Sequence, residues 1–258
     1  MLLTIDVGNT QIALGMFDED DLIGHWRVST EPLATFDEIR WQLTGILGAD
    51  GFAQSDILGV CVSSVVPAMT ATIRRVAPHV VSGSVVVVEP GVRTGLAIEI
   101  DNPREVGADR IVNAVAAYDW AQAGVVVVDF GTATTFDCIS PDGEYLGGVI
   151  APGIQISAEA LFSRASRLHR VDIARPPHVV GRNTAHSMQS GIVYGYAGLV
   201  DGLCQRLDAE LGFDHRIVAT GGHAPLIAAE AKYIERIDPN LTLTGLRLVY
   251  ERNRPHGP

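Results

Sequence analysis

The sequence predicts an α/β fold built from two related halves. Apolar strand-like runs alternate with amphipathic helical stretches, which is the pattern of mixed α/β proteins. The strand pattern also recurs at about half the length of the 258-residue chain, which indicates an internal duplication. With 47% hydrophobic and 19% charged residues, the chain can bury a large core, and this composition excludes a disordered protein.

The duplication is clearest in two apolar runs that each end in Asp-x-Gly and a small polar residue. The first run is LLTIDVGNT (Leu2–Thr10) and the second is VVVVDFGTATT (Val125–Thr135). One offset of 123 residues relates three pairs of positions, namely Asp6 and Asp129, Gly8 and Gly131, and Gly24 and Gly147. Each run therefore opens a predicted strand–turn–strand unit, with turns near Phe17–Asp21 and Ser140–Gly143.

A later strand in each half ends in a small-residue loop and a proline. These segments are GVCVSSVVP (Gly59–Pro67) and IVATGGHAP (Ile217–Pro225), and their alignment needs an insertion in the second half. Apolar residues at helical spacing predict four helices between the strands, over Thr35–Leu47, Met69–Val76, Ala108–Ala123 and Asn183–Leu211. We expect an N-terminal half of residues 1–120 and a C-terminal half of residues 121–258, with a frayed tail over Glu251–Pro258.

Charge and cysteine content restrict the partners and the compartment. The net charge is −11, and Lys232 is the one lysine among 19 basic residues, so we expect neither nucleic-acid nor acidic-membrane binding. The cysteines Cys61, Cys138 and Cys204 lie far apart beside apolar residues, which predicts buried thiols in a reducing compartment. The N-terminus lacks a signal-peptide pattern and no apolar run could span a bilayer, so we expect a cytoplasmic protein.

The two Asp-x-Gly turns favour a phosphate ligand. A glycine lets phosphate approach the backbone closely, consecutive N–H groups can surround its oxygens, and Thr10 or Thr132 can add a hydroxyl. Carboxylates such as Asp6 and Asp129 beside a polyphosphate require a bridging cation, so the pair predicts a nucleotide held with metal between the two halves. A lone Asp-x-Gly would more simply cap a turn. GxxxxGK[ST] and GxGxxG are absent, which excludes a P-loop and argues against a Rossmann site.

The segment Asp101–Asp119 is the second candidate site. Pro103 and Gly107 precede a predicted helix, and Asp109 falls in its first turn. The helix dipole stabilises a carboxylate there by ~0.3–1 kcal/mol, so we expect Asp109 to have a low pKa and to remain ionised at neutral pH. An ordinary N-terminal helix acid followed by a solvated arginine would give the same pattern.

The helix predicted after Asn183 carries four glycines, Gly191, Gly195, Gly198 and Gly202. Each glycine costs about 1 kcal/mol of helix stability relative to alanine, so their spacing requires a reason. Close packing of another helix explains it, either within the chain or across a subunit contact, and the sequence does not decide between the two.

Six motifs in this order resemble the type III pantothenate kinase family over nearly the whole chain. They are DVGNT (Asp6–Thr10), EVGADR (Glu105–Arg110), DFGTATT (Asp129–Thr135), GGVIAPG (Gly147–Gly153), GRNT (Gly181–Thr184) and TGG (Thr220–Gly222). The resemblance implies duplicated actin/hexokinase/Hsp70-like (ribonuclease H-like) half-domains with mixed sheets and helices. It also implies ATP-dependent phosphorylation of pantothenate to 4′-phosphopantothenate, the first step of coenzyme A biosynthesis, with Mg²⁺, a monovalent cation (K⁺ or NH₄⁺) and a homodimer.

By position, the resemblance also implies roles for individual residues. Asp109 corresponds to the catalytic base, and Asp129 to the ligand of the monovalent cation. Pantothenate-binding positions are Gly107, Ala108, Asp109, Arg110 and Thr184. ATP-binding positions are Asp6, Val7, Gly8, Asn9, Thr10, Gln11 and Thr132.

Three other functions share this fold. A non-catalytic regulator is disfavoured by the intact Asp6, Asp109 and Asp129 and by the acidic charge. An actin- or Hsp70-like ATPase that acts on another protein usually has a much longer chain. GADR and GRNT disfavour a sugar kinase or another small-molecule kinase.

Overall fold

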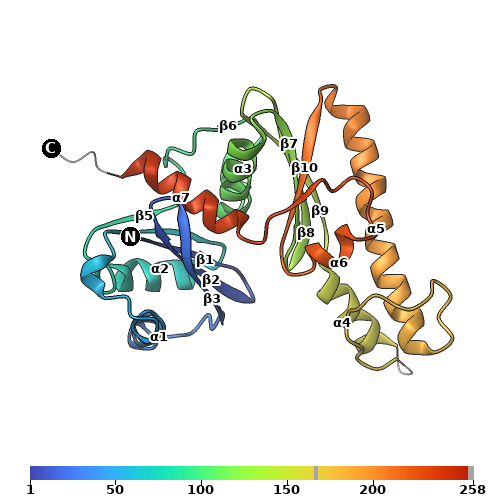
Figure 1. Ribbon diagram of the computed structural model, residues 1–258, viewed down its shortest axis with the longest axis horizontal. Coiled ribbons are helices and arrows are strands. Elements are labelled where there is room, and N and C mark those ends of the chain that lie inside the picture. Colours follow the sequence, from blue (N-terminus) through green and yellow to red (C-terminus); the bar gives the residue numbers. More distant parts are fainter. Residues whose placement is uncertain (166–167, 255–258) are drawn as a thin grey trace. The chain divides into compact units, whose positions relative to one another are not determined.

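The computed structural model describes residues 1–165 and 168–254, and these form two compact units (Figure 1). The first unit contains residues 1–97, 101–116 and the C-terminal helix, and the second contains residues 98–100 and 117–240. The division near residue 116 lies close to the boundary expected at residue 120. The C-terminal helix, however, belongs to the first unit, whereas we expected it in the C-terminal half.

The first unit is built on a five-stranded sheet with the order β3-β2-β1-β4-β5. Strands β1 and β2 are antiparallel, as are β2 and β3, whereas β4 is parallel to β1 and β5 is parallel to β4. The strands are β1 (Leu2–Val7), β2 (Gln11–Asp18), β3 (Asp21–Ser29), β4 (Gly59–Ser64) and β5 (Ser84–Val87).

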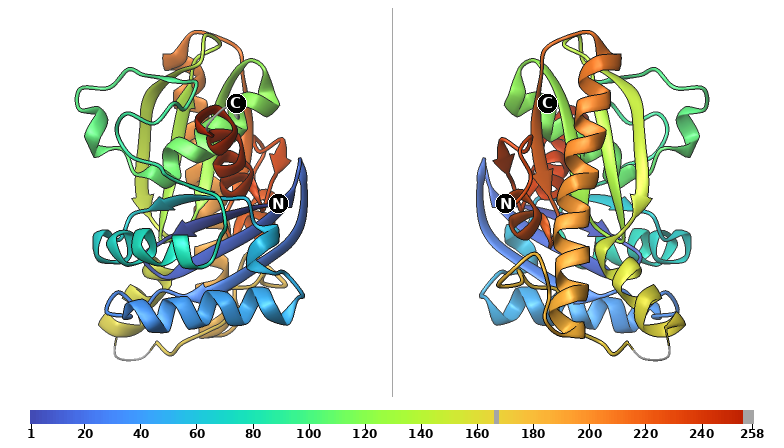
Figure 2. Two further views of the ribbon diagram at one scale, coloured as in Figure 1. Left: turned by 90° about the vertical axis from the view of Figure 1, so that its left-hand side faces the viewer. Right: turned by 90° about the vertical axis from the view of Figure 1, so that its right-hand side faces the viewer.

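Alternation along these strands sends apolar side chains to one face, where they form a core with two helices. These helices are α1 (Phe36–Ala49) and α2 (Pro67–Val76) (Figures 1 and 2). On the other face, α7 (Leu241–Asn253) packs against β1 and β4. Helix α3 (Ala108–Ala121) begins in the first unit and ends in the second.

The second unit has a six-stranded sheet with the order β11-β10-β7-β8-β9-β6. The strands are β6 (Ala97–Ile98), β7 (Gly124–Phe130), β8 (Ala133–Ile139), β9 (Glu144–Pro152), β10 (His215–Thr220) and β11 (Arg236–Ile237). Three helices pack on one face of this sheet, α4 (Ile154–Arg164), α5 (Thr184–Leu211) and α6 (Ala224–Ala228). Short 3₁₀ turns lie in the first unit at Gln54–Asp56, Ala77–His79 and Pro103–Glu105.

The two sheets confirm the duplicated α/β fold. Strands β1–β3 and β7–β9 each form an antiparallel meander, and β4 and β10 lie parallel to β1 and β7, respectively. Even an irregularity recurs, since the register shifts between Met16 and Phe17 in β2 and between Cys138 and Ile139 in β8. Each half therefore repeats the same local folding pattern.

The four helices expected from the sequence are confirmed, and two of them have clear capping residues. Thr35 forms a capping box with Glu38 at the start of α1, and Asn183 accepts a hydrogen bond from the His186 N–H at the start of α5. The sequence did not predict helices α4, α6 and α7. Residues 251–253 end α7 and are not frayed, while the rest of the expected tail from residue 255 lies outside the described residues.

Two further expectations concern side chains and membranes. Cys61, Cys138 and Cys204 are all buried free thiols, as expected. Among the described residues, no helix is both long and apolar enough to span a bilayer.

Candidate functional site

Asp6 lies near the end of β1, on the sheet face opposite the core shared with α1 and α2. The parallel register pairs it with Ser63 on β4, and the buried Ser63 hydroxyl donates a 2.6 Å hydrogen bond to Asp6 Oδ1. Burial raises the pKa of Asp6 from 3.8 to about 7, with the charge of Asp109 adding to the increase. The Ser63 hydrogen bond and the charge of Arg27 oppose it. A cation bound at Asp6 would therefore stabilise its ionised carboxylate.

The segment after Asp6 forms a tight turn at Gly8. Val7 ends β1, and the Gly8 N–H donates to the Gln11 carbonyl oxygen at 3.0 Å, which closes a tight turn. A Cβ at Gly8 would lie only 3.1 Å from that oxygen. Asn9, Thr10 and Gln11 are exposed. The loop can therefore present backbone N–H groups to an anion.

Asp109 lies in the first turn of α3, in the same unit as Asp6. The Arg110 N–H donates to its Oδ1 at 2.8 Å, and Oδ1 occupies the space that a Cβ at Gly107 would need. The Ile111 N–H in turn bonds to the Gly107 carbonyl oxygen. The segment Gly107–Arg110 therefore holds the Asp109 carboxylate at the start of the helix. Ala108 lies between Gly107 and Asp109 in the sequence.

The low pKa expected for Asp109 is wrong. Burial raises its pKa, and neither the Arg110 N–H nor the Arg110 charge offsets this effect. The helix-terminus argument omitted desolvation, which depends on the tertiary packing. Asp109 also raises the pKa of Asp6, so the two carboxylates lie close enough to interact electrostatically. Two adjacent acids with raised pKa values are typical of functional sites.

The second unit brings the Asp129 and TGG segments together. Asp129 is paired in register with Thr135 on β8 and with the buried Thr220 on β10. A Cβ at Gly221 would lie 2.8 Å from Asp129 Oδ1, and its φ of +92° is one that glycine adopts readily. The Thr220–Gly222 loop therefore packs directly against the end of β7. Thr132 is exposed in the turn after Asp129.

Each strand-end aspartate thus has a hydroxyl residue beside it on the next parallel strand. Ser63 stands beside Asp6, and Thr220 stands beside Asp129. Sequence analysis did not single out Ser63, and it named Thr220 only as part of the TGG motif. Their signal was present in the GVCVSSVVP and IVATGGHAP strands, each of which has a hydroxyl residue where the apolar run ends.

Thr184 is the first residue of α5 and is exposed. It belongs to the second unit, whereas Gly107–Arg110 belong to the first. The residues expected to bind pantothenate are therefore contributed by two parts of the fold. The residues expected to bind ATP lie at and after the ends of β1 and β7, and those expected to bind pantothenate lie at the starts of α3 and α5.

The donor set suits hard cations. Among residues 1–165 and 168–254, no group of three or more His, Cys, Asp or Glu side chains is placed to hold a metal. Mg²⁺ in phosphate-transfer sites usually takes only one or two carboxylates and completes its shell with phosphate and water. Asp6 fits that limited role, and the carboxylate of Asp129 is an oxygen ligand of the kind that hard cations prefer.

Comparison with known proteins identifies the family. A model of the type III pantothenate kinase family matches residues 2–206, which is most of the chain. The chain belongs to the type III pantothenate kinase family. The type III pantothenate kinase of Myxococcus xanthus is 55% identical over 253 residues, covering 98% of this chain and 99% of that protein. The type III pantothenate kinase of Geobacter sulfurreducens is 52% identical over 254 residues, which cover 98% of this chain and 100% of that protein.

Solved structures agree on the fold. A Baf family transcriptional activator from Campylobacter jejuni superimposes with a TM-score of 0.61 at 19% identity, covering 97% of this chain and 98% of that one. A 2-dehydro-3-deoxygalactonokinase protein from Sinorhizobium meliloti superimposes with a TM-score of 0.59 at 11% identity. The match covers 99% of this chain and 100% of that one. Similarity at this level establishes the actin/hexokinase-like fold alone. Membership of the type III pantothenate kinase family makes the chain an enzyme of the kinase class.

Proposed function

We propose that this enzyme transfers the γ-phosphoryl group of ATP to the primary hydroxyl of pantothenate, with Asp109 as the base. The family supports the reaction, and the placement of Asp109 beside Asp6 in one unit supports the assignment. Phosphoryl transfer depends mainly on positioning and charge stabilisation. The site therefore has to align an alcohol, accept its proton and hold the triphosphate.

Asp109 suits the first two tasks. Its carboxylate accepts a hydrogen bond from the pantothenate hydroxyl and takes the proton as the new O–P bond forms. The bond between the γ-phosphorus and the bridging oxygen breaks, and ADP leaves with that electron pair. A base works best when its pKa lies near the working pH, so the raised pKa of Asp109 favours this role. Arg110 is assigned to the pantothenate carboxylate, because a guanidinium can bind a carboxylate through two N–H groups.

Asp6 and the loop Val7–Gln11 are assigned to the ATP phosphates and Mg²⁺, and Thr132 to a further ATP contact. Bound Mg²⁺ neutralises charge on the phosphate oxygens. Asp129 is assigned to a monovalent cation, K⁺ or NH₄⁺, whose charge offsets part of the phosphate charge in a chain without a P-loop lysine. Gly107, Ala108 and Thr184 complete the proposed pantothenate contacts.

We also propose that the enzyme is a homodimer that acts in the cytoplasm. Gly191, Gly195 and Gly198 are exposed on α5, and a Cβ at any of them would meet no atom within 4 Å. At 100° per residue, this glycine stripe lies opposite α5 residues that pack on the sheet, such as Val200 and Cys204. Packing among residues 1–165 and 168–254 therefore gives no reason for the stripe. The buried free thiols favour a reducing compartment.

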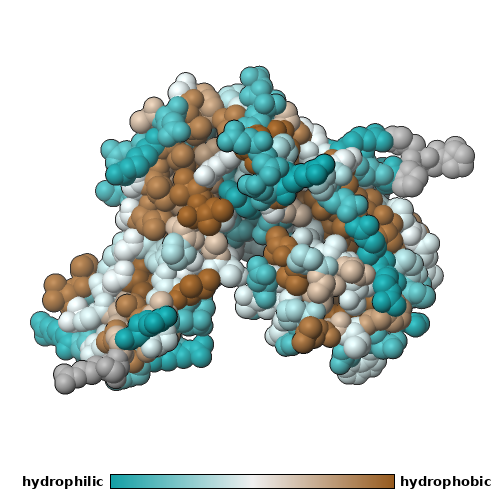
Figure 3. Space-filling view, turned by 180° about the vertical axis from the view of Figure 1, so that it is seen from behind, coloured by the Kyte–Doolittle hydropathy of each residue, from teal (hydrophilic) through white to brown (hydrophobic). Residues whose placement is uncertain are grey.

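The apolar surface of the second unit supports the same proposal. Exposed hydrophobic residues there include Ile150, Ile156, Val179 and Val180, and the left-hand part of Figure 3 shows brown hydrophobic areas on this unit. Large exposed apolar areas are typical of protein interfaces.

One comparison of variants tests the base. Asp109→Asn should lower kcat by roughly 10²–10⁴-fold, the range for loss of a general base, while the enzyme still binds ATP. Asp119→Asn is the matched control, because Asp119 lies exposed near the end of the same helix. A near-normal kcat for Asp109→Asn would remove the base assignment without affecting the family activity.

A further inference from the structure

Arg27 lies in a cross-sheet row with Asp6. Arg27 on β3 pairs with Ala13 on β2, Ala13 pairs with Asp6 on β1, and Asp6 pairs with Ser63 on β4. Side chains directly opposite one another in a sheet project from the same face. Ala13 contributes only a methyl group, so no long side chain separates the Arg27 guanidinium from the Asp6 carboxylate.

The alternation of β3 supports this orientation. Trp26 and Val28, the neighbours of Arg27 in sequence, pack against the core shared with α1 and α2. Arg27 therefore projects from the opposite face, where Asp6 lies. Its charge reaches that carboxyl group, since it lowers the pKa of Asp6.

The end of β3 is also attached to the loop that follows Asp6. The Thr30 hydroxyl donates to the Gly8 carbonyl oxygen at 2.7 Å, and the Thr30 N–H donates to the Thr10 carbonyl oxygen at 3.0 Å. Arg27 is three residues before this attachment. The backbone that carries Arg27 is therefore fixed relative to the proposed phosphate loop.

Arg27 is exposed, and its guanidinium forms neither a hydrogen bond nor an ion pair with any other described residue. By contrast, Arg74 and Arg247 of the same unit are paired with Glu89 and Asp20. A guanidinium that lies on the same sheet face as Asp6, and that forms no hydrogen bond or ion pair with the described residues, suits an anionic ligand.

We propose that Arg27 binds a phosphate oxygen of ATP. The inference rests on the proposed assignment of the Asp6–Gln11 loop to the ATP phosphates. Guanidinium groups bind phosphate through two parallel N–H donors, so Arg27 supplies charge and orientation. It thereby takes a role that a lysine fills in P-loop enzymes, in a chain whose lysine, Lys232, lies in the other unit.

The test measures binding of a non-hydrolysable ATP analogue with Mg²⁺, together with the KM of each substrate. Arg27→Ala should raise the Kd of the analogue and the KM of ATP by roughly 10- to 100-fold, the range for one charge-assisted hydrogen-bonding group, with the KM of pantothenate changed less than about twofold. Arg27→Lys should recover part of the loss. Arg40→Ala is the matched control, because it removes the same charge from an exposed position. Arg40 lies on α1, on the opposite side of the sheet.

Two results would overturn the proposal. One is a Kd for Arg27→Ala that equals the value for Arg40→Ala. The other is a change confined to the KM of pantothenate, which would assign Arg27 to the pantothenate carboxylate. Thr10→Ala separates this inference from the loop assignment. If Thr10→Ala weakens nucleotide binding and Arg27→Ala does not, only the role of Arg27 fails; if neither does, the loop assignment fails with it.

Discussion

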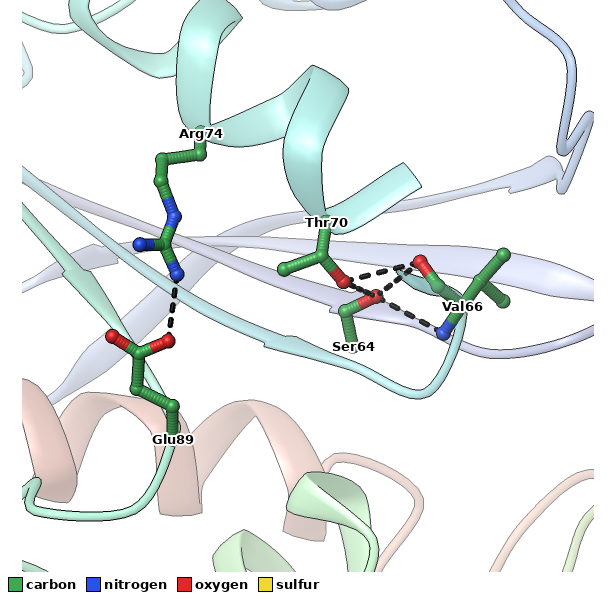
Figure 4. A network of polar contacts seen from close by, with 5 residues as sticks. All are labelled: Ser64, Val66, Thr70, Arg74 and Glu89. Carbon is green, nitrogen blue, oxygen red and sulfur yellow. Dashed lines mark hydrogen bonds and ion pairs between the residues drawn. The ribbon is translucent and has the colours of Figure 1, made fainter. Parts of the chain in front are cut away.

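The Ser63 hydroxyl donates a 2.6 Å hydrogen bond to Asp6 Oδ1 across the parallel strands β4 and β1. Ser63 is fully buried, and its donor holds one carboxylate oxygen of Asp6 in place. The next residue along β4, Ser64, has a different task. Its hydroxyl contacts Thr70 and the backbone of Val66 at the start of α2 (Figure 4). Two adjacent serines therefore serve two separate parts of the unit.

This contrast gives a first prediction. Ser63→Ala should lower kcat/KM for ATP by about tenfold, because Asp6 loses a hydrogen bond to a charged group. That bond lowers the pKa of Asp6, so its loss should also move the acid limb of the pH–rate profile to higher pH. Ser64→Ala, the control, should lower the melting temperature without moving this limb. Identical pH profiles for Ser63→Ala and wild type would contradict the positioning role.

A second prediction concerns the stability of the ligand-free enzyme. The pKa of Asp6 is about 7 in the folded state against 3.8 as the reference value, so the native state binds more protons between these values. The contribution of Asp6 to stability is therefore greatest below pH 4 and is lost as the pH rises through 7. Asp6→Asn removes this penalty. Its melting temperature relative to wild type should rise by a few degrees from pH 5 to pH 8, measured calorimetrically without nucleotide. A constant difference would disprove the raised pKa.

A third prediction concerns the monovalent cation. Replacing K⁺ by Na⁺ should strongly depress the activity of the wild-type enzyme if a K⁺ ion binds at Asp129. Asp129→Asn should have low activity in both salts, since the amide lacks the charge that attracts the ion. Asp119→Asn should retain the K⁺ dependence of wild type. Activity indifferent to the exchange in wild type would contradict the role given to Asp129.

A fourth prediction concerns the glycine stripe of α5. Gly195→Leu should shift the enzyme toward monomer in sedimentation equilibrium, because a bulky side chain blocks close approach of a second helix. Gly45→Leu is a matched control, since Gly45 is an exposed glycine on α1 with no atom within 4 Å of its Cβ position. A normal dimer for Gly195→Leu would place the subunit contact elsewhere.

The sequence predicted the repeated part of the fold well because the repeat is local. Strands β1 to β3 and β7 to β9 follow one another through short turns, so a single offset of 123 residues relates them. The sequence did not predict helix α4, because only Ile154 and Ala158 are buried in it. Two buried residues are too few to give a clear helical periodicity of apolar positions. Helix α7 was missed for the opposite reason. Its apolar residues Leu241, Leu246 and Val249 are joined by others on several sides, so no single stripe stands out.

Site features that bring distant segments together could not be predicted from local sequence patterns. Ser63 and Asp6 are 57 residues apart, and only the register of β1 and β4 brings them together. The row that aligns Arg27 with Asp6 depends on two further registers. The direction of the Asp109 pKa shift depends on how deeply the start of α3 is buried, and the sequence gives only its position in the helix.

The length of α5 has a thermodynamic consequence. Its 28 residues span about 42 Å, whereas α1, which also connects a third strand to a fourth, has 14. The strands of the second sheet, at most nine residues long, span roughly 30 Å, so part of α5 extends past them. If a second copy covers this overhang, folding is linked to association by mass action. The melting temperature should then rise with enzyme concentration, and the lifetime of the enzyme in the cell would depend on how much of it is expressed.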